Sequence, residues 1–134
     1  MTATRVPVAG DTVVFNDGAT VTLDANAACA AMTVNGAVSI SGAYDLAVSG
    51  NITGGTGTPV LSLEGVNLSL SASSTVSGIS FVLADGATLV VPSSVTLSPT
   101  PTTNVARSRV KTVTSSGTTT YSVEAIPGTT FTVY

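Results

Sequence analysis

A short unit recurs along this chain: a polar residue and a glycine, followed by a strand in which alternate residues are apolar. Two copies are nearly identical, and they occupy residues 17–23 (Asp-Gly-Ala-Thr-Val-Thr-Leu) and 85–91 (Asp-Gly-Ala-Thr-Leu-Val-Val). Looser copies lie between them, at residues 35–40, 42–48 and 64–70. This pattern is typical of a tight turn followed by a short β-strand. Because one such unit cannot bury its apolar face alone, its repetition predicts a stacked solenoid.

The spacing of the copies gives the size of one coil. Asp17 and Asp85 are 68 residues apart, which divides into three coils of roughly 20–25 residues, the usual length of a solenoid repeat. Leu46 precedes Leu68 by 22 residues, and Leu68 precedes Leu89 by 21. Parallel stacking therefore predicts that these three leucines form one column of the core. A Greek-key sandwich is the alternative, since it also has many short strands, but the near-constant spacing favours the solenoid.

The side chains available for a core are mostly small. The 134 residues include three Tyr, three Phe and no Trp, so Val, Leu, Ile and Ala must form the interior. Charged residues make up 8% of the chain and mean hydropathy is +0.51, which excludes an ordinary solvated disordered chain. A chain with so little charge would expose many strand edges as a monomer, so we expect partners to cover part of its surface.

The sequence divides into four expected segments within an all-β fold. Residues 1–10 are expected to form an N-terminal arm, and residues 11–98 a short β-solenoid (β-helix) of about four coils. Residues 99–104 contain two prolines and are expected to form an extended linker. Residues 105–134 are expected to form an antiparallel β-hairpin or meander that serves assembly or docking.

The C-terminal segment has a pattern that fixes the register of a hairpin. A turn at Ser116-Gly117 makes the numbers of opposed residues sum to 233. This register pairs opposite charges on one side and apolar or mixed residues on the other: Arg109 with Glu124, Lys111 with Ser122, Val110 with Val123, and Thr112 with Tyr121. A register that yields both an ion pair and an apolar pair is favoured. A third strand is expected at Thr130–Tyr134.

An alanine-rich stretch, residues 25–31, is the one place where a helical turn is expected. Alanine favours helix, and Asp24 or Asn26 could cap the turn. Such a turn would cover the open end of the solenoid. Cys29 lies in this stretch and, as a lone cysteine, cannot form an internal disulfide. Because the chain has no His to lower its pKa, we expect a small buried apolar residue rather than a reactive thiol.

Charge is distributed unevenly along the chain. Residues 1–100 hold one basic and six acidic residues, a net −5, whereas residues 101–134 hold three basic and one acidic, a net +2. An acidic body with a basic tail could help subunits pack together or dock on another surface. Three basic residues are too few to predict nucleic-acid binding. The sequence has no apolar run long enough to predict a membrane-spanning helix.

No residue set predicts catalysis, a metal or a cofactor. Histidine, the common acid–base and metal-binding residue, is absent. Asp17 and Asp85 precede glycines in turns, a position that aspartate takes for backbone reasons. The glycine-rich residues 54–57 lack the lysine of a phosphate loop, and no calcium-loop motif is present. A polysaccharide-cleaving enzyme would need Asp and Arg clustered along a groove, yet residues 11–98 contain no basic residue.

Three strings carry a resemblance to known proteins: residues 10–15 (Gly-Asp-Thr-Val-Val-Phe), 17–24 and 32–36 (Met-Thr-Val-Asn-Gly). They resemble the opening of short β-helical domains in bacterial surface proteins and in bacteriophage structural proteins, over roughly residues 10–98. Small phage proteins of this kind look like capsid decoration or cement proteins, or like pieces of tail spikes. The first ten residues lack a secretory signal pattern, which agrees with a leaderless phage protein.

The resemblance implies a structural virion protein on the outer capsid surface, with no catalytic residues. Its implied partners are further copies of itself, as a trimer, and the major capsid protein. The candidate contact residues are the basic and aromatic residues of the C-terminal segment: Arg107, Arg109, Lys111, Phe131 and Tyr134. The three basic residues are expected either to form a solvated strand face or to meet an acidic partner surface.

The alternative function is a carbohydrate-binding or adhesin module of a bacterial surface protein. An exposed row of aromatic residues on one solenoid face would favour it. The sequence offers Tyr44 as a candidate, whereas Phe81 lies in an apolar run and is expected in the core.

Overall fold

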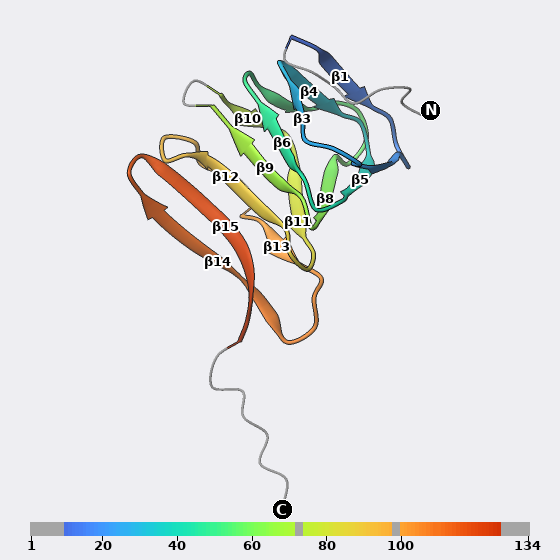
Figure 1. The fold of residues 1–134 in the computed structure, drawn as a ribbon. Coiled ribbons are helices and arrows are strands. Elements are labelled where there is room, and N and C mark those ends of the chain that lie inside the picture. The colour runs from blue at the N-terminus through green and yellow to red at the C-terminus, as the bar shows by residue number, and fades with distance from the viewer. Residues whose placement is uncertain (1–9, 72–73, 98–99, 127–134) are drawn as a thin grey trace, which may run out of the picture.

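The structure is a computed structural model, and it describes residues 10–71, 74–97 and 100–126. Over these residues the chain forms fifteen β-strands in three sheets, and it has no helix. Three short strands make one coil, and about four coils stack to form a β-solenoid (Figure 1). The fold predicted from the repeat is therefore confirmed.

Each of the three sheets takes one strand from every coil. Sheet A consists of β1 (Thr12–Phe15), β4 (Ala31–Val34), β7 (Ile52–Gly54) and β10 (Val76–Ser77). Sheet B consists of β2 (Thr20–Thr22), β5 (Ala37–Ser41), β8 (Val60–Glu64), β11 (Ser80–Leu83) and β13 (Thr102–Thr103). Sheet C consists of β3 (Ala27–Cys29), β6 (Asp45–Val48), β9 (Asn67–Leu70), β12 (Thr88–Pro92), β15 (Thr118–Ala125) and β14 (Ser108–Ser115).

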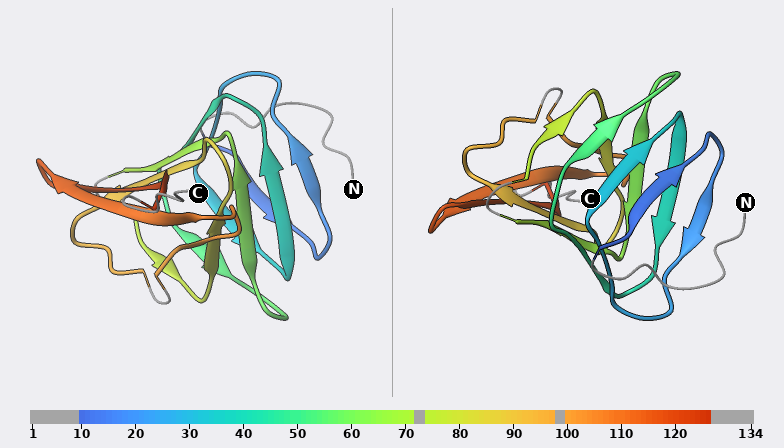
Figure 2. Two further views of the ribbon diagram at one scale, coloured as in Figure 1. Left: turned by 90° about the horizontal axis from the view of Figure 1, so that it is seen from below. Right: turned by 90° about the horizontal axis from the view of Figure 1, so that it is seen from above.

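Stacking within the solenoid is parallel, and the hairpin of β14 and β15 extends sheet C at one end. The first coil, formed by β1 to β3, and this hairpin lie at opposite ends of the stack (Figures 1 and 2). β15 pairs antiparallel with β12, and β14 pairs antiparallel with β15. The molecule therefore has two chemically different ends.

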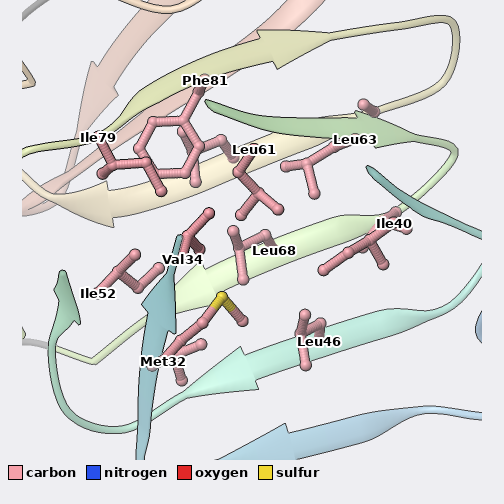
Figure 3. Packing of buried hydrophobic residues seen from close by; sticks show 14 of the residues in the cluster. Met32, Val34, Ile40, Leu46, Ile52, Leu61, Leu63, Leu68, Ile79 and Phe81 are labelled. Atoms are coloured by element: carbon pink, nitrogen blue, oxygen red, sulfur yellow. The ribbon is translucent and has the colours of Figure 1, made fainter. Parts of the chain in front are cut away.

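The core is a set of aligned apolar columns, as parallel stacking requires. Leu46 pairs with Leu68, and Leu68 pairs with Leu89, so the predicted leucine column is confirmed. All three are almost completely buried. Side chains from all three sheets meet in the interior (Figure 3), among them Phe81, which is buried as expected.

The two nearly identical strings do not stack on each other, so the spacing argument based on them is wrong. The strand after Asp17 is β2 in sheet B, whereas the strand after Asp85 is β12 in sheet C. The same turn-and-strand chemistry serves different corners of the coil, and sequence likeness alone does not say which. The stacking registers instead give coils of 19 residues, from Ala27 to Leu46, up to 24 residues, from Ile52 to Val76.

The helical turn expected at residues 25–31 is wrong. This stretch contains β3 and the first residue of β4. β3 pairs with β6, and this pairing buries Ala27 and Cys29 in the core. The Ala30 amide donates to the carbonyl of Asp11 at 2.6 Å, so it bonds across the coil rather than within a helix. The helix preference of alanine is under about 1 kcal/mol per residue, which this burial exceeds.

The hairpin has the predicted register. Ser116 and Gly117 have φ of 52° and 82°, which is the backbone of a type I′ turn. Arg109 pairs with Glu124, Lys111 with Ser122, Val110 with Val123 and Thr112 with Tyr121. Preceding the hairpin, β13 pairs parallel with β11, so residues 102–103 of the proline-rich stretch begin a further coil. The third strand expected at Thr130–Tyr134 and the arm of residues 1–9 lie outside the described residues.

Candidate protein contact surface

The outer face of sheet C is the broadest continuous surface that the registers define, because it crosses all six strands. Paired residues in a sheet point to the same side, so the registers list its composition. One row contains only small or β-branched side chains: Ala28, Ala47, Ser69, Val90, Thr120 and Val113. Such a row makes a smooth surface on which another protein could pack closely.

A second row of the same face is polar and runs from an acid to a base. It contains Asp45, Asn67, Thr88, Ser122 and Lys111. The Asn67 Nδ2 donates to Asp45 Oδ1 at 3.3 Å, and the Thr88 hydroxyl donates to Asn67 Oδ1 at 2.6 Å. These bonds hold three successive coils in one register and orient the outer side chains.

The basic residues predicted as contacts gather at the hairpin end of this face. Arg109 and Lys111 are two residues apart on β14, so both lie on the outer face. The Arg109 Nε lies 3.2 Å from Glu124 Oε2, and the two side chains are 55% and 28% exposed. Lys111 is exposed and stands opposite Ser122. The predicted ion pair is confirmed, and it leaves a net positive charge on the hairpin.

The other predicted contact residues are placed differently. Arg107 is exposed in the turn before β14, where its φ is 58°, and its carbonyl accepts a hydrogen bond from the Ile126 amide at 3.0 Å. Phe131 and Tyr134 lie outside the described residues. Among the predicted contacts in the described residues, the structure thus brings Arg109 and Lys111 together on one face.

Exposed apolar residues near the hairpin were missed by sequence reasoning. Val113 is 46% exposed and Ile126 is 42% exposed. Val113 follows Arg109 and Lys111 at the same two-residue interval, so strand alternation alone would have placed it on the outer face. The contact surface at this end therefore combines positive charge with an exposed apolar side chain.

The acidic turn residues have structural partners. The Asp17 Oδ1 accepts a hydrogen bond from the Ala37 amide at 2.9 Å, one coil further along. Three asparagines act in the same way on the next coil: Asn26 accepts from Asp45 at 3.0 Å, Asn35 from Thr56 at 3.0 Å, and Asn51 from Thr75 at 3.1 Å. Polar residues at the corners therefore satisfy backbone amides of the following coil.

Cys29 is buried in the core and is 1% exposed, as predicted. Burial raises its pKa from 9.0 to about 11, and the nearby charge of Asp11 acts in the same direction. The thiol is therefore protonated at neutral pH and contributes to packing.

The residues that the structure describes hold no group of three or more metal-ligating side chains. Across the same ranges, no helix has the length and apolarity needed to cross a bilayer. Of the four aromatic residues in this part of the chain, Tyr44 is exposed, Phe15 is half-buried, and Phe81 and Tyr121 are buried. The described surface thus has no row of aromatic rings on which a sugar could stack.

Comparison with known proteins yields no match to a family model, to a curated protein or to a solved structure.

Proposed function

We propose that this chain is a structural virion protein, a capsid decoration or cement protein that binds the outer capsid surface and stabilises the shell through protein–protein contacts. It acts as a homo-oligomer, with three chains as the expected number, and its principal partner is the major capsid protein.

The observation that supports this proposal is the outer face of sheet C. Its row of small side chains crosses six strands without a large projecting residue, and its hairpin end carries Arg109, Lys111 and Val113. A flat face with a charged border can be covered by another protein at little cost in side-chain ordering. The rigid hydrogen-bonded stack behind this face is preformed for binding.

The mechanism follows from this arrangement. A stiff solenoid laid across neighbouring capsid subunits contacts them all through one continuous surface. Separating the subunits would then expose the buried contact area again, and this cost would stabilise the shell. The hairpin charges orient the docked molecule, because charges at the rim of an interface mainly set orientation and association rate.

The test compares shells assembled with variants of the chain. Ala47→Arg places a long charged side chain in the middle of the outer face of sheet C, where Ala47 is exposed. We expect this variant to be lost from purified shells, and those shells should lose integrity at a lower temperature. Ser39→Arg is the matched control, because Ser39 is exposed on β5 of the same coil but in sheet B. Shells that keep their stability without this chain would contradict the proposal.

A further inference from the structure

Sheet C ends at β14 on one side and at β3 on the other, within the described residues. β14 is eight residues long, roughly 26 Å at the usual rise of a strand. The outer edge of a terminal strand presents backbone N–H and C=O groups that can pair with another strand. The two ends of sheet C are therefore candidate sites for adding a strand from another molecule.

The direction of β14 makes these two edges compatible. β12 runs parallel to β9, β6 and β3, and β15 runs antiparallel to β12. Because β14 runs antiparallel to β15, it again has the direction of the solenoid strands. A second copy stacked on this end could thus place its β3 beside β14 and continue the parallel sheet.

Straight continuation of the rows aligns opposite charges across such a contact. The row of Lys111 passes through Asp45, and it reaches Asn26 in the first coil because Leu46 pairs with Ala27. Two residues earlier on each strand, the row of Arg109 reaches Asp24. In a stack with aligned rows, Arg109 of one copy therefore faces Asp24 of the next.

The charges of the two ends also decide against symmetric contacts. Residues 10–30 contain Asp11, Asp17 and Asp24 and no basic residue, whereas residues 105–126 contain three basic residues and Glu124. Pairing β14 with its own copy would bring Arg109 and Lys111 of both molecules together. Pairing β3 with its own copy would bring the acidic first coils together. Only the head-to-tail contact joins opposite charges.

We infer that copies of this chain associate head to tail, with β14 of one copy pairing in parallel with β3 of the next and Arg109 facing Asp24. This inference rests on the self-association in the proposed function and names the surfaces that meet. Such a heterologous contact closes into a ring when its rotation allows, as in a trimer, and otherwise extends into a filament. Backbone pairing supplies the contact, and the charges select its polarity.

The experiment inverts one charge at each end and measures mass by size-exclusion chromatography with light scattering. Asp24→Arg makes the first coil basic. The double variant Arg109→Glu with Glu124→Arg inverts the charge on β14 but keeps the ion pair of the hairpin and the net charge of the chain. Asp85→Arg is the matched control, because Asp85 is an exposed turn aspartate of the fourth coil, away from both edges.

We expect the wild-type chain and Asp85→Arg to form the same oligomer or filament. Asp24→Arg and the double variant should each have the mass of one chain, 13.2 kDa, with unchanged circular dichroism. Mixing these two variants should restore assembly, since each supplies the complement that the other has lost. Restoration in the mixture would support the pairing of the two named edges.

Two results would overturn the inference in different ways. An oligomer that persists in both charge variants would refute the head-to-tail contact and leave the proposed self-association intact. A wild-type chain that remains monomeric at low and high salt would refute the contact together with self-association. Variants that are monomeric alone and stay monomeric when mixed would show that β14 and β3 do not meet.

Discussion

Tyr121 of β15 lies directly opposite Leu89 of β12, at the point where the parallel solenoid changes to the antiparallel hairpin. Both side chains are buried, at 8% and 0% exposure. The leucine column of the coils therefore continues into the hairpin through an aromatic ring. This contact attaches the basic end of the molecule to the rest of the core.

Replacement of Tyr121 by Ala should loosen the hairpin. Loss of a buried aromatic side chain typically costs about 3–5 kcal/mol, and here the loss is concentrated where β15 meets β12. We expect faster tryptic cleavage after Arg109 and Lys111 and a lower midpoint in urea. Tyr121→Phe keeps the ring and serves as the control. Equal cleavage rates for the Ala and Phe variants would show that the ring does not hold the hairpin.

Leu68 is the central member of the leucine column, and Leu68→Ala should destabilise the whole stack. Leu68 is completely buried between Leu46 and Leu89, so the substitution leaves a cavity enclosed by aligned coils. We expect a loss of about 3 kcal/mol in the free energy of unfolding, measured by chemical denaturation. Ser69→Ala, the next residue on the outer face, should change it by less than about 0.5 kcal/mol. Similar losses in both variants would contradict the stacking register.

The sequence was sufficient to predict the solenoid, the leucine column and the hairpin register, because each rests on local periodicity. Alternation along a strand and a turn with positive φ at Ser116 and Gly117 are properties of neighbouring residues. The Arg109–Glu124 pair followed from the same register. In each case the information lies within a few residues of the feature that it specifies.

Features that depend on which coils stack were not predictable in this way. The strings at Asp17 and Asp85 are alike because both begin at a corner, yet the following strands enter different sheets. The alanine-rich residues 25–31 favour helix locally, but pairing with β6 determines their conformation. The assembly edges at β14 and β3 became visible only when strand direction was known. Tertiary pairing, which the local pattern does not encode, decides all three.

Gly54 allows two coils to approach closely, and Gly54→Ala should destabilise the solenoid. A Cβ at this position would overlap the carbonyl oxygen of Gly78 in the next coil, and backbone cannot move aside cheaply. We expect a loss of about 1–3 kcal/mol, seen as a lower denaturation midpoint. Thr53→Ala, at the exposed neighbouring position, is the control and should have a smaller effect. A Gly54→Ala protein as stable as wild type would mean that the coils are further apart than described.

Cys29 should make stability fall at alkaline pH. Its pKa is raised from 9.0 to about 11 in the folded protein, so below pH 9 the thiol is protonated in both states and its full contribution to stability is present. As pH rises from about 9 to about 11, the unfolded chain releases the proton first, which stabilises the unfolded state.

The loss should approach about 2–3 kcal/mol, since one pKa unit corresponds to about 1.4 kcal/mol. Denaturation midpoints measured across this pH range should fall more steeply for wild type than for Cys29→Ala, which lacks the titrating thiol but shares every other group. The buried thiol should also react with alkylating reagents at pH 8 only after denaturation, because the thiolate is the reactive form. Parallel curves for the two proteins, or rapid alkylation of the folded chain, would place Cys29 outside the core.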